Sequence, residues 1–166
     1  MYQRPLRCGN FHDRVKKVFV LAAVVCAAAC SGAPPPPPFK PVADTKLLMQ
    51  AVVDPTADEI WDAVRTIITD KGTEEIRPKT KEEWDAVRNH AVTLAEAGNL
   101  LMMVPRAKDG GEWMARAQEM IETSEKAIHA AEAKNADQLF TAGGEIYDSC
   151  SNCHRKYMDA IVNANR

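Results

Sequence analysis

The chain has 166 residues with a formal net charge of −2, and 46% of its side chains are hydrophobic. This length and composition fit one helical domain with a single compact core. Residues 1–29 hold five basic residues and one acidic residue, so without them the totals of 21 basic and 23 acidic residues fall to 16 and 22. The remaining chain has a formal charge of −6 and no basic stripe. Such a chain is not expected to bind nucleic acid.

The N-terminal segment has the three parts of a secretory signal peptide. Basic residues precede an apolar run at residues 18–29, and the small residues Cys30-Ser31-Gly32 follow it. An apolar run of this length is too short to span a bilayer. The sequence therefore predicts a signal peptide over residues 1–29 and export to the periplasm, and an N-terminal membrane anchor that is never cut is the alternative.

The residues around Cys30 resemble the lipobox of bacterial lipoproteins, in which the cysteine carries the lipid and becomes the first residue. Ala27 departs from that pattern, which most often has leucine there. We expect lipidation of Cys30, because a lipoprotein cysteine supplies the more than one acyl chain that stable anchoring needs. Ordinary cleavage nearby is the alternative. With lipidation, the protein meets the membrane only through its lipid anchor.

Residues 30–43 form a proline-rich linker, with consecutive prolines at residues 34–38. Such a run adopts polyproline II at about 3.1 Å per residue and so acts as a stiff spacer of roughly 15 Å. This suits a domain held away from a membrane, and a disordered tail without a task is the alternative. The domain itself is expected over residues 44–166.

Helical periodicity begins at the start of this domain. Apolar residues recur at helical spacing over residues 47–68, and Lys71-Gly72 ends the pattern. Within this stretch Asp54-Pro55 has the form of an N-cap followed by proline at the first helical position. We therefore expect a first helix in two pieces, broken or kinked at Pro55.

Three further amphipathic segments follow. Residues 80–83 (TKEE) form a capping box, and behind it apolar residues continue at steps of three and four to about Val104. Similar stripes run over residues 113–131 and 139–161. Four long amphipathic segments without an alternating strand pattern predict an all-α fold, and in particular an antiparallel four-helix bundle.

One motif carries chemistry, since Cys150, Cys153 and His154 form a C-x-x-C-H sequence in the last predicted helix. On a helix these positions fall within an arc of about 100°, so both thiols and the imidazole are expected to share one face and to point into the bundle. This arrangement suits thioether bonds from two sulfurs to the vinyl groups along one edge of a porphyrin, with the adjacent histidine on the iron. The sequence therefore predicts one covalent haem c, attached in the C-terminal helix.

Two other uses of the cysteines are the alternatives. A redox C-x-x-C usually lies at a helix N-terminus, where the helix dipole lowers the thiol pKa, whereas here the apolar stripe begins three turns earlier. A structural zinc site needs four ligands, and besides the C-x-x-C-H motif the domain has only His90 and His129. Haem attachment is favoured over both.

Residues 139–157 (LFTAGGEIYDSCSNCHRKY) resemble the terminal helix of class II c-type cytochromes, the cytochrome c prime family. The helix layout is similar from Ala43 onward, and only the last helix carries a specific motif. The resemblance implies a periplasmic four-helix bundle, often a homodimer, with His154 as an axial iron ligand and Tyr157 packed in the haem pocket. Met158 stands where many members have a basic residue near the haem, so no haem-gating role is carried over from that residue.

The resemblance also points to Met49 on the first helix. In the family this helix approaches the other face of the haem, where an apolar residue leaves the iron five-coordinate and a methionine makes it six-coordinate. Met49 lies near the expected position, and a thioether ligand raises the reduction potential, as suits an electron acceptor. The alternative is that Met49 only fills the core.

These observations predict a monohaem c-type cytochrome that carries single electrons between periplasmic redox proteins. An enzyme is not expected, because the sequence shows no paired carboxylate cluster, nucleophile elbow or phosphate loop, and chemistry is left to the haem. The first alternative is a five-coordinate haem protein that binds nitric oxide or carbon monoxide, as a sensor or scavenger. The second is a dithiol exchange protein.

Overall fold

The computed structural model describes the backbone of residues 39–164 and the side chains of residues 39–158. The expected signal peptide, most of the expected linker and Cys30 lie outside the described residues. Pro41–Arg166 form one compact unit. This unit is mostly helical with one small two-stranded sheet, so the broad expectation of a helical protein is confirmed.

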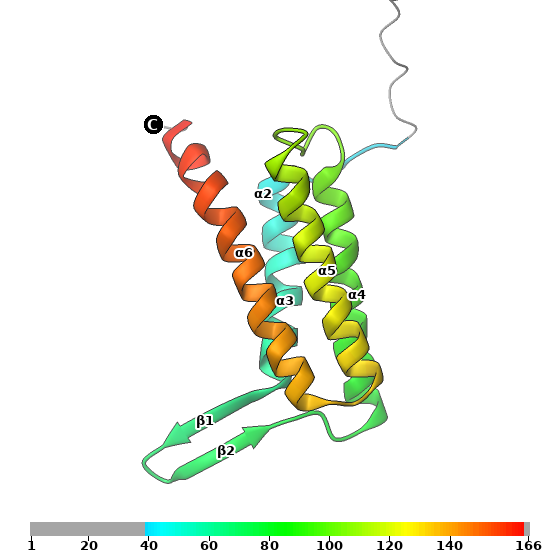
Figure 1. Cartoon of the computed structure of the whole chain (residues 1–166), viewed down its shortest axis with the longest axis vertical. Coiled ribbons are helices and arrows are strands. Elements are labelled where there is room, and N and C mark those ends of the chain that lie inside the picture. The colour runs from blue at the N-terminus through cyan, green and yellow to red at the C-terminus, as the bar shows by residue number, and fades with distance from the viewer. Residues whose placement is uncertain (1–38, 165–166) are drawn as a thin grey trace, which may run out of the picture. The chain divides into compact units, whose positions relative to one another are not determined.

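In chain order the elements are α2 (Thr45–Leu48), the π-helical turn η2 (Met49–Val53), α3 (Asp54–Ala63), β1 (Arg65–Thr69), β2 (Gly72–Ile76), α4 (Lys81–Met102), α5 (Glu112–Glu132) and α6 (Ala136–Ala164). Figure 1 labels the elements of the described chain except η2, which lies between α2 and α3. None of the helices in the described part of the chain is long and apolar enough to cross a membrane.

The first helix runs on through the point where a break is predicted. Asp54 has φ −58° and ψ −59°, the values of a helix interior, so the predicted N-cap at this residue is wrong. The N-cap is Asp44, whose carboxylate accepts the N–H of Leu47 at 2.7 Å. Instead of a break, the chain has the π turn η2 directly before α3.

The π turn is explained by Pro55. A proline inside a helix removes one hydrogen bond, and its ring clashes with the carbonyl group four residues earlier. In a π turn the hydrogen bonds reach back five residues, and the N–H of Asp54 bonds to the carbonyl of Met49. The wider turn admits the proline without ending the helix, and the buried residues here, Leu48 and Val53, are five positions apart.

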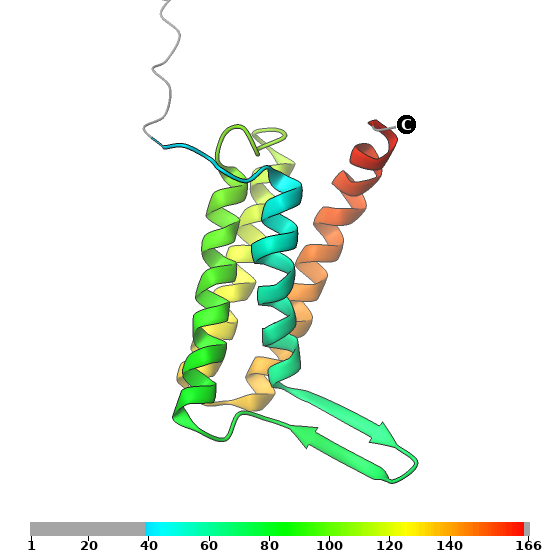
Figure 2. The same cartoon turned by 180° about the vertical axis from the view of Figure 1, so that it is seen from behind.

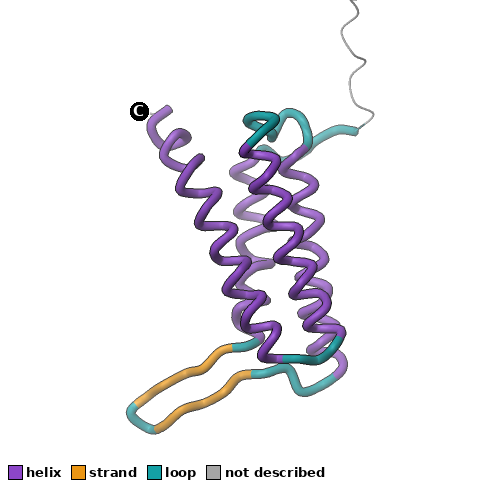
Figure 3. The backbone as a smooth tube through the Cα atoms, in the orientation of Figure 1, coloured by secondary structure: helices purple, strands orange, loops and turns teal. Residues whose placement is uncertain are grey.

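Residues 65–76 form a β-hairpin where the sequence pattern predicts the end of the first helix. α3 stops at Ala63, since Val64 is extended with φ −137° and ψ 104°. The hairpin projects from the end of the helical unit at which α3 ends and α4 begins (Figures 1 and 3). The prediction of a helix through Ile68 is therefore wrong.

The local sequence accounts for the hairpin. Positions 66–69 hold four β-branched residues in succession, and such side chains crowd the preceding turn of a helix but fit a strand. A two-residue turn joins the paired strands, and Gly72 after it has φ +134°, which other residues rarely adopt. Because the adjacent Ile67 and Ile68 have no polar residue between them, the sequence lacks the alternation typical of a strand.

The capping box predicted at Thr80 is confirmed. The Thr80 hydroxyl accepts the N–H of Glu83 at 3.1 Å, and the Glu83 carboxylate accepts the N–H of Thr80 at 3.0 Å. α4 begins there and ends at Met102, two residues before the predicted end. The buried Arg106 donates to the carbonyl of Leu100 at 3.0 Å, and so satisfies an acceptor in the last turn of α4.

The helices share one hydrophobic core. α4 packs against α5, α5 against α6, and α3 against α4. The largest fully buried apolar side chains are Ile60, Leu94, Leu139 and Ile146. Trp61 donates its indole N–H to the carbonyl of Gly143 at 2.9 Å, which joins α3 to the N-terminal half of α6. Toward its C-terminal end, α6 leans away from α2 and α3 (Figures 1 and 2).

Gly98 lets α4 approach α5 closely, since a Cβ there would lie 2.5 Å from Cγ1 of Ile121 and 3.0 Å from the carbonyl oxygen of Ala117. We expect Gly98→Ala to lower the free energy of unfolding by about 1 kcal/mol. Overpacking costs about 1–3 kcal/mol, which outweighs the roughly 0.5–1 kcal/mol by which alanine favours a helix over glycine. Urea unfolding followed by circular dichroism measures the change.

Gly144→Ala on α6 is the matched control, because nothing lies within 4 Å of the position its Cβ would take. This variant should gain about 0.5–1 kcal/mol of stability from the helix preference of alanine. Equal changes in the two variants would contradict a close approach of α4 and α5 at Gly98.

Candidate functional site

The C-x-x-C-H motif lies on α6, in the half of the helix that leans away from α2 and α3. Cys150 and Cys153 are half-buried free thiols. His154 is exposed. All three residues are helical, so the structure brings them together on one helix as the sequence predicts.

Burial raises the pKa of both thiols. For Cys150 burial is the largest cause, and the negative charge of Asp54 on α3 raises the pKa further. For Cys153 burial again comes first, followed by the charge of Cys150, while the cation of Arg116 acts in the opposite direction. Neither thiol lies at a helix N-terminus, where the dipole lowers a thiol pKa. Both therefore differ from the reactive thiolate of a dithiol exchange protein.

The rest of the described chain leaves one apolar stripe of α6 uncovered. Phe140, Tyr147 and Met158 are 64%, 61% and 49% exposed, and with His154 they fall within an arc of about 40° on the helix. We call these four residues the α6 stripe. Cys150 lies about 40° from His154 at its edge. A stripe of three uncovered apolar side chains and an imidazole, with the Cys150 thiol at its edge, fits a flat apolar group held through that thiol and the neighbouring one of Cys153.

Tyr157 is turned toward α5. Its half-buried ring lies edge-on against Trp113, with the ring centres 4.9 Å apart and an angle of 78° between the rings. Its hydroxyl donates to Oδ2 of Asp109 at 2.6 Å. The contacts of Tyr157 are thus those of a joint between two helices, whereas the family resemblance implies a place for this residue in a haem pocket.

Asp109 organises this joint from the loop before α5. Its Oδ1 accepts the N–H groups of Gly111 at 2.9 Å and Trp113 at 3.0 Å, which satisfies free donors at the start of α5. The pKa of Asp109 is lowered by the hydrogen bond from Tyr157 first and by these N–H groups next. Desolvation and then the hydrogen bond to Asp109 raise the pKa of Tyr157 to about 12.

Ion pairs continue along the same side of the two helices. Nζ of Lys156 lies 3.1 Å from a carboxylate oxygen of Glu112. Arg116 bonds to Glu119 at 2.7 Å and to Glu112 at 3.5 Å. Arg116, Glu112 and Glu119 all lie on α5, so of these pairs only Lys156–Glu112 joins α6 to α5. As an exposed pair it adds little to the contacts of Tyr157.

Met49 opens the π turn of the first helix. It is partly buried and packs against the hydrophobic core, as do Cys150 and Tyr157. The structure therefore places Met49 and Cys150 on different elements around the same core. These contacts are those of a packing residue, and a bond from Met49 to iron stays a prediction.

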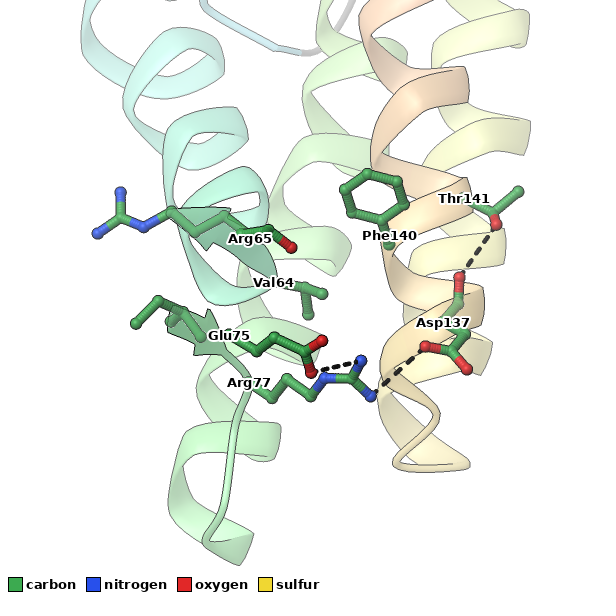
Figure 4. Close-up of a pocket in the computed structure, with 9 residues that line it drawn as sticks. Val64, Arg65, Glu75, Arg77, Asp137, Phe140 and Thr141 are labelled. Carbon is green, nitrogen blue, oxygen red and sulfur yellow. Dashed lines mark hydrogen bonds and ion pairs between the residues drawn. The ribbon is translucent and has the colours of Figure 1, made fainter. Parts of the chain in front are cut away.

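Two cavities lie nearer the N-terminal end of α6. One, of about 310 Å³, lies between the hairpin and α6, and Arg77, Asp137 and Phe140 are among its lining residues (Figure 4). The other, of about 510 Å³, is lined partly by Lys126 and Glu145. Neither cavity is lined by the C-x-x-C-H motif. Among the side chains of residues 39–158, no three His, Cys, Asp or Glu residues form a cluster that could hold a metal ion.

The joint between α5 and α6 is not predicted from the sequence. The available signal is Asp109, since an aspartate just before a helix is a capping residue. The contact between Trp113 and Tyr157 joins residues far apart in the chain, and no local pattern predicts it.

Comparisons with protein-family models, with curated proteins and with solved structures find no match to this chain. The resemblance of residues 139–157 to class II cytochromes therefore depends on the motif itself. The arrangement of residues on α6 is therefore the remaining basis for inferring a function.

We expect Tyr157→Phe to lower the free energy of unfolding at neutral pH, because Asp109 loses its hydroxyl donor. Since the folded state raises the pKa of Tyr157, the contribution of this hydroxyl is fully present below the ordinary value of 10.0 and is lost as pH rises through about 12. The difference between the variant and the wild type should therefore shrink over that range. Urea unfolding of both proteins at a series of pH values measures it.

Tyr147→Phe is the control, because Tyr147 is an exposed tyrosine of the same helix that makes an edge-on aromatic contact with Trp61. This variant should keep both the stability and the pH dependence of the wild type. If Tyr157→Phe had the same stability as the wild type, only the ring of Tyr157 would contribute, and a difference that did not shrink as pH rose through about 12 would contradict the hydrogen bond to Asp109 as its source.

Proposed function

We propose that this chain is an exported monohaem c-type cytochrome that carries single electrons between periplasmic redox proteins. The observation that carries the proposal is the C-x-x-C-H motif on α6, with two half-buried free thiols, an adjacent exposed imidazole and the uncovered α6 stripe. These groups suit thioether attachment of a haem better than thiol exchange, since burial raises both thiol pKa values.

The finer fold that we propose is the antiparallel four-helix bundle of class II cytochromes. Its four segments would be the first helix (residues 45–63), α4, α5 and α6. Short connections join α4 to α5 and α5 to α6, as expected of antiparallel neighbours. Between the first helix and α4 the connection is the hairpin.

Cys150 and Cys153 would hold the haem through two thioether bonds, and His154 would be an axial ligand of the iron. When bound, the haem supplies an iron that alternates between ferric and ferrous forms and so carries one electron. The chain holds this half of α6 in place through the contacts of Tyr157 with Trp113 on α5 and with Asp109 before it, and through the ion pair of Lys156 with Glu112. Because the chemistry belongs to the haem, we propose no catalytic side chain and no enzymatic activity.

Met49 is the proposed second axial ligand. It begins a π turn, and π turns are frequent at functional sites. A methionine ligand would make the iron six-coordinate and suit an electron carrier. If Met49 only packs in the core, the iron would be five-coordinate, and binding of nitric oxide or carbon monoxide as a sensor or scavenger would be the function.

The location that we propose is the periplasm. Residues 1–29 would be a lipoprotein-type signal peptide, Cys30 would carry the lipid, and residues 30–43 would link it to the domain of residues 44–166. The membrane would then be contacted only through the lipid anchor. The proposed partners are periplasmic redox proteins and a second copy of the chain in a homodimer.

The covalent haem is tested directly. After treatment of the purified protein with acid and acetone, haem absorbance should stay with the wild-type chain and be lost completely in a variant with both Cys150→Ser and Cys153→Ser. Ser151→Ala, at a half-buried position between the two cysteines, is the control and should retain the haem. Haem that extracts from the wild type, or that stays on the double variant, would refute thioether attachment.

The role of Met49 is tested by absorption spectra of the oxidised and reduced holoprotein, with and without carbon monoxide. We expect a low-spin spectrum that carbon monoxide does not change, and a high-spin, carbon monoxide-binding protein after Met49→Ala, because the substitution removes an axial ligand. Met114→Ala, at a half-buried methionine on α5, should leave the spectrum unchanged. A wild type that is already high-spin and binds the gas would contradict the carrier and favour the gas-binding protein.

A further inference from the structure

The hairpin of β1 and β2 stands apart from the helices (Figure 3). Every residue of β1 is exposed, and in β2 only Ile76 is partly covered. Ile67 and Ile68 are 37% and 78% exposed. The described part of the chain therefore leaves apolar surface of this element uncovered. A two-stranded hairpin without a packed face is only marginally stable in water, so a partner that covered it would stabilise it.

The base of the hairpin is nevertheless held against α6. Arg77, directly after β2, lies 3.0 Å from the carboxylate of Glu75 and 3.5 Å from that of Asp137 on α6. Figure 4 shows this bridge beside the cavity of about 310 Å³. This exposed ion pair is a link between the base of the hairpin and α6.

The two outer edges of the hairpin differ in charge. β1 (RTIIT) has no charged side chain between Arg65 and Asp70, whereas β2 (GTEEI) carries Glu74 and Glu75. Charged side chains on an edge strand oppose its pairing with another chain, and their absence permits pairing. β1 is therefore the edge that is open to a partner strand.

We propose that β1 pairs with β1 of a second copy of this chain, antiparallel and about a two-fold axis at Ile67. The two-residue turn makes Thr69 and Gly72 a hydrogen-bonded pair, so alternate residues of β1 direct their backbone groups to β2, and Thr66 and Ile68 direct theirs to the free edge. With the axis at Ile67, Thr66 of each copy faces Ile68 of the other, and each such pair can exchange two hydrogen bonds.

The side chains of this pairing are compatible. The Ile67 residues of the two copies face each other as a non-hydrogen-bonded pair, in which side chains approach most closely. The same arrangement on β2 would instead set Glu74 against Glu74, and like charges directly opposite each other are destabilising. Self-pairing through β1 is thus favoured over self-pairing through β2, and the interface is isologous, with the same residues on both copies.

The cavity beside the hairpin supports the same register. With the axis at Ile67, Asp70 of the second copy falls opposite Val64, which lines the cavity. The cavity lining also includes the guanidinium of Arg77, paired with the carboxylates of Glu75 and Asp137. Charges of both signs therefore lie where the turn of the second copy, with its aspartate and its lysine, would arrive.

This proposal says which surface joins the two copies in the homodimer of the proposed function. It rests on that function for the choice of a second copy as the partner, but it does not depend on the haem. Sedimentation equilibrium of the full-length holoprotein tests it. We expect a dimer for the wild type. Ile67→Lys should weaken dimerisation at least tenfold, because two lysines would then face each other across the axis. Glu74→Lys on β2 should dimerise as the wild type does. Circular dichroism checks that both variants keep their helices.

Each other outcome would overturn the proposal. A dimer that persists in Ile67→Lys, or one that weakens equally in both variants, would mean that the copies meet elsewhere, while the homodimer itself would stand. A monomeric wild type would refute both this interface and the proposed homodimer. The partner of β1 would then be a different protein, if there is one. Haem attachment is judged separately by the acid and acetone treatment, so its failure and the failure of this interface are distinguishable.

Discussion

The rest of the candidate site depends on how α6 is held against α5 by Trp113, Tyr157 and Asp109. This joint fixes the half of α6 that carries both cysteines while the helix leans away from α2 and α3. One side of α6 is therefore packed, and the α6 stripe on another side is left uncovered. A haem held at Cys150 and Cys153 needs such a helix, because the protein has to orient the ligands and still leave apolar surface for the ring.

In the first helix a single residue, Pro55, determines the local backbone geometry. Pro55 cannot donate a hydrogen bond, and the chain responds with a π turn rather than a break. The wider turn places Leu48 and Val53 in the core and begins at Met49. Whether Met49 serves as a ligand or as packing, its position is thus set by a proline six residues later.

The features that the sequence predicts best are those that depend on neighbouring residues. The capping box at Thr80 is local, because its two hydrogen bonds join residues within one turn, and it is confirmed. The C-x-x-C-H motif is also local, so its shared helical face follows from spacing. The hairpin escapes the pattern because Ile67 and Ile68 are adjacent, and consecutive β-branched residues decide the local structure against apolar periodicity.

By itself the sequence determined the mostly helical class, the helix start at Thr80 and the common face of Cys150, Cys153 and His154, since each depends on residues within a few turns of one another. Only the tertiary structure decided that Tyr157 faces α5 rather than the α6 stripe, because its partners Trp113 and Asp109 come from distant parts of the chain. The same holds for the exposure of the stripe, which depends on where the neighbouring helices lie. Burial and partner choice are properties of packing, and the spacing of residues along one helix does not contain them.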